Sequence, residues 1–160
     1  SSVGAAFDYS STGGPNFREQ PLRPYWLGSP GELMELPLTT VYWGLLRQLG
    51  HWLYPSLWRL PQLRGALARI GMLERIPLTP EGVSAAEAIR GVDIAIDQGL
   101  PVLVFSFHSS SLPPGLSPYV RTPADLDRFY DWWRELFAYL AKRGVAPSSV
   151  GDILSSVELA

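Results

Sequence analysis

Proline and glycine interrupt this chain along its whole length and limit the regular elements that it can form. The sequence has 15 glycines and 15 prolines among 160 residues, close to a fifth of the chain, against roughly 12% in average proteins. Because proline breaks helices and central strands and glycine weakens both, many short elements and few long helices are expected. The 46% of apolar residues is still enough for one domain to bury a core.

Charge and cysteine content exclude several classes of protein. The net charge of −2 gives no overall positive field to bind a nucleic acid backbone, so we expect no nucleic acid partner. The absence of cysteine excludes disulfide scaffolds, thiolate zinc sites and cysteine nucleophiles. No apolar run approaches the roughly 20 residues of a membrane span, so we expect a soluble chain without a transmembrane segment.

Two helices have clear start signals. The first is expected over residues 83–98, where Ser84 and Glu87 have capping-box spacing and Gly99 follows the end. Its buried stripe would consist of Ala85, Ala88, Ile89, Val92 and Ile96. Asp93 and Asp97 share one face of this helix. We interpret them as a solvated face, with acid–base work as the alternative.

The second helix is expected to run from Thr122 to Gly144, with Thr122 as its cap and Pro123 at its first position. Its apolar face would contain Leu126, Phe129, Trp133, Leu136, Phe137 and Leu140. Trp132 and Tyr130 flank this face and are also expected to pack in the core. A last short helix is expected from Val150 onward.

Two segments with opposite character precede the first helix. Residues 10–31 are rich in turn formers and predict a long loop, which covers a core or contacts a ligand. Residues 44–71 carry four arginines and no acid, which favours a pair of short helices that cover one face, with a membrane surface or a partner as alternatives. His51 in this segment is expected to be a packed or surface histidine.

A run without polar alternation, Val102–Phe107, leads directly to His108. Such a run after a helix is typical of a central parallel strand, and parallel sheets place their sites at the carboxyl ends of strands. The shorter runs 33–39 and 73–79 share a Pro-Leu-Thr ending and are expected to be strands with similar exits. His108 is thus the best candidate for chemistry in an α/β fold.

Histidine exchanges protons near neutral pH, so His108 could be a general acid or base. A structural imidazole is the alternative that its position leaves open. No Gly-x-Ser-x-Gly elbow and no His-x-x-x-His motif is present, which argues against a serine hydrolase or a metal site of the known type in this chain.

Several segments, in order, resemble bacterial polysaccharide deacetylases of the NodB type. Residues 101–121, the expected helix 122–143 and residues 144–150 are similar to the carboxyl-terminal part of these proteins. The middle of the same proteins is similar to residues 7–11, 13–18 and 34–39. The resemblance spans nearly all of the chain, taken as one domain fragment of residues 1–160.

The resemblance implies an incomplete, distorted (β/α)7 barrel that removes N-acetyl groups from amino-sugar polymers with a divalent, zinc-like metal. It implies that His108 is the catalytic acid and that Leu103, Phe105 and Phe107 line the acetyl pocket. Asp8 falls near the family's mid-barrel aspartate, although Thr12 stands where a tryptophan is usual. A bacterial protein of the cytoplasm or periplasm is implied.

The family's amino-terminal half, with its Asp-Asp pair and His-x-x-x-His motif, has no counterpart in the sequence. We therefore expect that this chain cannot bind the metal through the known motif and is inactive alone. Exposed sheet edges predict self-association or pairing with a missing amino-terminal half. The rival hypothesis is a non-catalytic module, either one that docks a partner or one that binds carbohydrate by stacking on Trp26, Trp43 and Tyr119.

Overall fold

The computed structural model describes residues 21–29, 31–57 and 60–157, and within them the fold is mixed α and β. Two small antiparallel sheets are present, β1 (Tyr25–Leu27) with β2 (Leu33–Glu35) and β3 (Thr40–Trp43) with β4 (Glu74–Pro77). The helices of the described part are α1 (Gly50–Ser56), α2 (Pro61–Arg69), α3 (Ala85–Asp97), α4 (Pro123–Lys142) and α5 (Val150–Val157), with short 3₁₀ turns η2 (Arg47–Leu49) and η4 (Ser109–Ser111). The described residues form no closed barrel. The incomplete (β/α)7 barrel that the resemblance implies remains a prediction.

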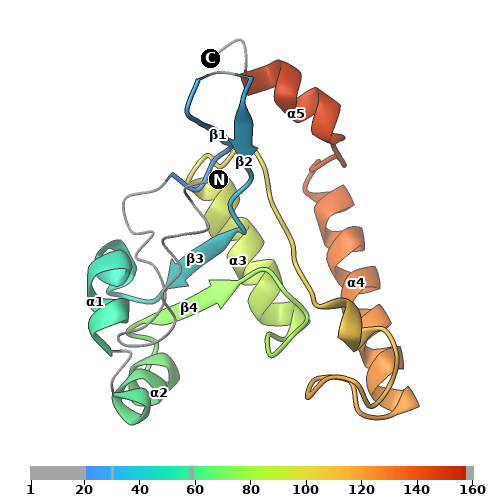
Figure 1. Cartoon of the computed structure of the whole chain (residues 1–160). Coiled ribbons are helices and arrows are strands. Elements are labelled where there is room, and N and C mark those ends of the chain that lie inside the picture. Colours follow the sequence, from blue (N-terminus) through green and yellow to red (C-terminus); the bar gives the residue numbers. More distant parts are fainter. Residues whose placement is uncertain (1–20, 30, 58–59, 158–160) are drawn as a thin grey trace.

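Helix α3 is the centre of the packing, between the β3–β4 sheet and α4 (Figure 1). On the sheet side the core contains Val41, Ile76, Ile94 and Ala95. Between the two helices it contains Leu78, Ala88, Val92, Trp132, Leu136 and Leu140. Gly91 permits the close approach, because a Cβ there would lie 3.0 Å from a methyl carbon of Ile76 and 3.1 Å from one of Leu78.

The expected caps of both long helices are confirmed. The Glu87 carboxylate accepts from the Ser84 amide at 2.7 Å, and the Ser84 hydroxyl accepts from the Glu87 amide at 3.3 Å. Thr122 and Asp125 form the same reciprocal box at the start of α4. These caps satisfy amides that have no partner inside the helix, which is why the sequence located both starts.

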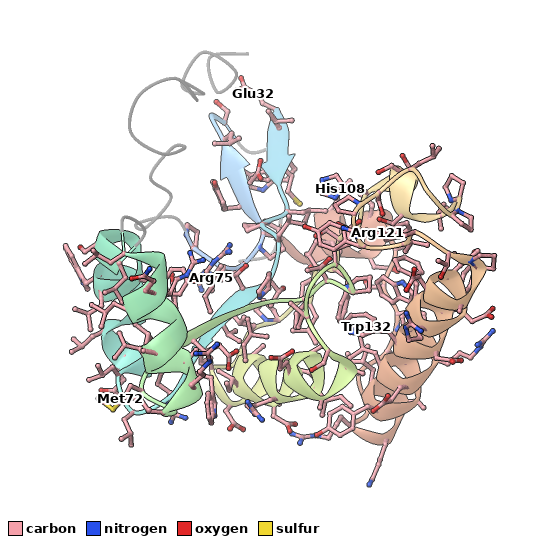
Figure 2. All side chains as sticks on the ribbon, turned by 90° about the horizontal axis from the view of Figure 1, so that it is seen from below. Glu32, Met72, Arg75, His108, Arg121 and Trp132 are labelled. Atoms are coloured by element: carbon pink, nitrogen blue, oxygen red, sulfur yellow. The ribbon has the colours of Figure 1, made fainter. Side chains whose placement is uncertain are left out.

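The apolar face expected for α4 is partly wrong. Trp132 is buried and donates from Nε1 to the Val83 carbonyl at 3.0 Å, and it points from α4 toward the interior in Figure 2. Phe137, expected in the core, is 56% exposed. The burial of Trp132 confirms the core packing expected for it, and its indole finds both apolar neighbours and a backbone acceptor.

Asp93 joins α3 to α4 rather than forming a solvated pair with Asp97. The Tyr139 hydroxyl donates to Asp93 Oδ1 at 2.6 Å, and the Arg143 guanidinium also binds this oxygen. These bonds act alongside the apolar contacts between the two helices.

The central parallel strand expected over Val102–Phe107 is wrong for the described part of the chain. The segment is extended but belongs to neither sheet. Thr39 donates its amide to the Val104 carbonyl at 3.0 Å, and Ser106 donates to the Leu78 carbonyl at 3.2 Å. On the other edge, the amides of Leu103 and Phe105 have no hydrogen-bond partner among the described residues. The run has the composition of a central strand but a neighbour on one edge only.

The two Pro-Leu-Thr segments differ from each other. Strand β2 ends at Glu35, before Pro37, whereas β4 runs through Glu74–Pro77. Across the described residues, no helix combines the length and apolar character needed to cross a membrane.

Candidate functional site

The candidate site forms where the end of the extended segment 102–107 meets the turn between β4 and α3. The hydrogen bond from the Ser106 amide to the Leu78 carbonyl fixes the two chains side by side. His108 lies two residues beyond Ser106, and Glu81 lies three residues beyond Leu78. The backbone therefore brings the two side chains together although they are 27 positions apart in the sequence.

The Glu81 carboxylate binds three groups of the opposite loop. Oε1 accepts from the His108 amide at 2.9 Å and from the Ser111 hydroxyl at 2.5 Å. Oε2 lies 2.6 Å from Nδ1 of the His108 ring. The Glu81 side chain is only 6% exposed, so these bonds replace the water that burial removes.

Two buried serines extend this arrangement behind the carboxylate. Ser111 ends η4, and its hydroxyl lies 3.0 Å from the hydroxyl of Ser117. Since a hydroxyl has one proton and Ser111 gives its own to Glu81, Ser117 is assigned as the donor of this bond. Ser117 in turn accepts from the Val120 amide at 3.1 Å. The network makes the loop around Glu81 one hydrogen-bonded unit.

The hydrogen bonds decide the charge state of Glu81. Burial raises the pKa of the Glu81 carboxyl, but the bond from the Ser111 hydroxyl, the two bonds from His108 and the attraction of the ring outweigh burial. The net pKa lies below its ordinary value, so Glu81 is an ionised carboxylate at neutral pH.

An ionised carboxylate only accepts hydrogen bonds, so the Nδ1 atom of His108 must carry the proton in this pair. The other ring nitrogen, Nε2, is then free to accept a proton, or to donate one when the ring is charged. The His108 side chain is 79% exposed, although the carboxylate that holds it is buried. The arrangement can therefore exchange a proton with a molecule that arrives from solvent.

His108 and Glu81 lie at a hollow of about 220 Å³, which Ser110, Ser117, Pro118 and Tyr119 also line. This is smaller than the roughly 300–1,000 Å³ of sites that enclose a drug-sized ligand. The hollow fits a small chemical group, with the rest of a larger molecule outside it. Figure 2 shows His108 beside the loop that carries Arg121, on the side of the molecule formed by α4.

The three apolar residues expected in an acetyl pocket pack elsewhere in the described part. Phe107 contacts Phe129 and Trp133 with ring centroids 5.4 and 5.9 Å apart. Phe105 packs on Trp133 at 6.0 Å, and Leu103 packs against both core clusters. None of them lines the hollow beside His108. Asp8 and the side chain of His51 lie outside the described residues.

Glu81, Ser111 and Ser117 were not predicted from the sequence. The available signal for Glu81 was its position in Thr79-Pro80-Glu81-Gly82, directly after the strand 74–77. A carboxylate at a strand exit is a candidate partner for a histidine at another strand exit. For the two serines, nothing in their turn-rich segment distinguishes them from their neighbours.

The described residues do not fit a divalent metal of the kind that the resemblance implies. They contain no group of three His, Asp or Glu side chains that could hold a metal ion. Glu81 and His108 supply two such groups, with the carboxylate already engaged in three hydrogen bonds. Within the described part of the chain, the implied metal therefore lacks a complete set of ligands.

The aromatic residues considered for carbohydrate stacking do not form one surface. Tyr119 lines the hollow beside His108, and Trp43 lines a separate hollow near Gly71. The Arg90 guanidinium lies 4.3 Å from the centroid of the Trp43 ring. One face of Trp43 is therefore already covered.

Comparison with known proteins gives no relative for this chain: no family model, no curated protein and no solved structure matches it.

Proposed function

We propose that His108, oriented by Glu81, is the proton-transferring residue of a hydrolase that cleaves the N-acetyl amides of amino-sugar polymers. The observation that carries this proposal is the contact of 2.6 Å between a buried carboxylate and the Nδ1 atom of an exposed imidazole. The resemblance to polysaccharide deacetylases of the NodB type supports the choice of substrate.

The role of each group follows from the site. In the hydrolysis of an amide, a water oxygen bonds to the carbonyl carbon and the bond from that carbon to nitrogen breaks. The charged imidazole of His108 donates its Nε2 proton to this nitrogen, so that the products are an amine and acetate. The carboxylate of Glu81 stabilises the imidazolium and fixes the ring. The hollow is of a size to hold an acetamido group, with Tyr119 at its edge to contact the sugar.

The described residues carry only part of such a reaction. Among the described residues, no hydroxyl forms a hydrogen bond with Nε2 of His108, and no group of three side chains that could hold a metal ion is present. We therefore assign the proton transfer to this chain and expect the isolated chain to release no acetate.

Two measurements test the proposal. The first is acetate release from oligomers of N-acetylglucosamine by the isolated chain with added zinc, for which no turnover is expected. Turnover that His108→Ala abolishes would refute the expected inactivity. The second follows the ring NMR signals of His108 and Tyr119 during titration with the same oligomers, and shifts of both signals are expected.

The titration also distinguishes the hydrolase from the rival function, a module that binds carbohydrate without catalysis. Glu81→Gln should reduce the shift of the His108 ring, because the variant removes the charge that stabilises the imidazolium and reverses the hydrogen bond at Nδ1, with Glu32→Gln as the control. If the oligomers shift Tyr119 but never His108, in wild type and variant alike, the chain binds sugar without placing the amide at the imidazole. That result would favour a binding module and contradict the hydrolase.

A further inference from the structure

The helices α1 and α2 expose two apolar stripes to solvent. From the turn before η2 into α1 the exposed residues Leu45, Leu49 and Trp52 follow each other at helical spacing, and from α2 to its C-cap the exposed residues Leu63, Ala66 and Ile70 do the same. Leu45, Ile70 and Trp52 are 82%, 69% and 61% exposed. Isolated exposed apolar residues are normal, but contiguous ones mark an interaction site. We call these six residues, with Arg47 and Arg69, the α1–α2 surface.

The backbone brings the two stripes together at one corner of the molecule. Leu45 donates its amide to the Gly71 carbonyl at 3.2 Å, and Leu46 donates to Met72 at 2.9 Å. The start of the first stripe therefore lies beside the end of the second. Leu45, Arg47, Gln48 and Gly71 also line one wide hollow of about 520 Å³. Both figures show α1 and α2 next to each other on one side of the fold.

The charge of this region has one sign. Residues 44–71 contain four arginines and no acidic residue, in a chain whose net charge is −2, so the remaining residues carry −6. Arg47 and Arg69 are exposed and have no ion pair with a carboxylate among the described residues. The Arg64 guanidinium lies over the Tyr54 ring at 5.6 Å, and Arg59 lies outside the described residues. Within residues 44–71, the apolar stripes are thus accompanied by cations alone.

The combination of apolar stripes and arginines distinguishes between two candidate partners of the α1–α2 surface, a second copy of the chain and an anionic lipid membrane. A second copy of the chain would bring the same cations face to face, which is repulsive. An anionic lipid surface supplies phosphates at the level of the arginine heads and acyl chains at the level of leucine and tryptophan. Each arginine near such a surface contributes about 1 kcal/mol of attraction.

We propose that the α1–α2 surface binds an anionic lipid membrane, with α1 and α2 lying in the headgroup region. In Figure 2 the helices α1 and α2 lie on the opposite side of the molecule from His108. Membrane binding therefore leaves the hollow beside His108 facing the water. The proposal is independent of the proposed function, because no residue is shared between the two sites.

Sedimentation with vesicles tests the proposal. The chain should bind vesicles of phosphatidylcholine that contain phosphatidylglycerol and should bind those of phosphatidylcholine alone much more weakly. Added salt should weaken binding, because it screens exposed charges. Arg47→Gln with Arg69→Gln should weaken binding about thirty-fold, from about 1 kcal/mol for each arginine. Leu45→Gln with Ile70→Gln should weaken binding at least about tenfold, because each side chain loses its apolar contact with lipid.

Matched controls keep the test specific. Arg128→Gln with Arg134→Gln removes the same charge from α4, and Leu116→Gln with Val150→Gln changes two side chains that are 68% and 60% exposed elsewhere. Neither control should change binding more than about twofold. All of these side chains are exposed, and far-UV circular dichroism checks that each variant folds.

Three results would overturn the proposal: no binding to the anionic vesicles, equal losses in the controls and the surface variants, or a dimer in light scattering that the surface variants dissociate. The last result would make the α1–α2 surface an interface between copies.

Discussion

Glu81 shows how a buried carboxylate can fix the orientation of an exposed side chain. It accepts from the Ser111 hydroxyl and from the His108 backbone with one oxygen, which leaves the other oxygen for the His108 ring. Because the carboxylate is held from behind, the ring is oriented without being covered. The exposed Nε2 atom of His108 is the consequence.

The first prediction concerns the tautomer of His108. In wild type, the neutral ring should carry its proton on Nδ1, because Glu81 only accepts there. In Glu81→Gln the amide oxygen can keep the bonds from Ser111 and the His108 backbone, so the amide nitrogen donates to Nδ1 and the proton moves to Nε2. The ¹⁵N shifts of the ring distinguish the two forms. Glu32→Gln, a distant change, should leave the shifts unaltered, and unchanged shifts in Glu81→Gln would contradict the assignment.

The second prediction concerns Ser111, which is completely buried. Ser111→Ala removes the donor to Glu81 and leaves Ser117 without its hydroxyl partner. The variant should lose about 1–3 kcal/mol of the free energy of unfolding, measured with urea. Ser109→Ala, at an exposed position in the same turn, should stay within about 0.5 kcal/mol of wild type. Equal losses at the two positions would show that burial of the Ser111 bond is unimportant.

At the scale of single residues, the sequence allowed His108 to be predicted but not its partner. His108 follows an apolar run, and that local pattern is enough to mark it. Glu81 is identified only by the bond from Ser106 to Leu78, which aligns two distant segments. Such a contact between segments has no local pattern in one sequence.

At the scale of elements, local signals succeeded where non-local ones failed. The caps at Ser84 and Thr122 lie within the helices that they start, so α3 and α4 could be predicted. Whether residues 102–107 form a central strand depends on which segments of the chain lie along their two edges, and no local sequence pattern shows this. Similarly, the spacing of apolar residues along α4 does not show that Phe137 is exposed, because this depends on which elements pack around the helix.

The third prediction uses two glycines inside helices. A Cβ at Gly91 would lie 3.0 Å from Ile76, whereas a Cβ at Gly65 of α2 would meet nothing within 4 Å. Gly91→Leu should therefore destabilise the fold by about 1–3 kcal/mol or more through overpacking. Gly65→Leu should be neutral or gain up to about 1 kcal/mol, because leucine is the better helix former. Urea unfolding of both variants checks this contrast, and equal effects would refute the close packing of α3 on the sheet.

At the scale of the whole molecule, the carboxyl groups determine how stability responds to acid. Hydrogen bonds from Thr122 lower the pKa of Asp125, and those from Ser149 lower the pKa of Asp152. The pKa of Glu81 is also lowered. Burial and the charge of Glu87 raise the pKa of Glu74, against the attraction of Arg90. Three groups therefore act in one direction and Glu74 acts in the other.

The fourth prediction follows from the sign of these shifts. A carboxyl with a lowered pKa in the folded state binds protons more tightly when unfolded, so its stabilising effect is complete above its unfolded pKa and is lost as the pH falls through its folded pKa. For Glu81 the loss begins near the ordinary value of 4.5. The urea midpoint should thus vary little between about pH 7 and 5 and fall below about pH 4.5.

The contribution of Glu81 can be separated by two variants measured over the same pH range. Glu81→Gln should be less stable than wild type at neutral pH but should lose less on acidification, because its hydrogen-bonded charge is already gone. Glu74→Gln should do the opposite, because Glu74 has a raised pKa in the folded protein. Removing this carboxyl should raise the stability of the folded protein at neutral pH and make the loss of stability toward acid pH steeper. If the curve of Glu81→Gln runs parallel to that of wild type down to acid pH, the carboxylate does not stabilise the fold as a charged group, and its assigned role in holding the His108 ring loses its electrostatic basis.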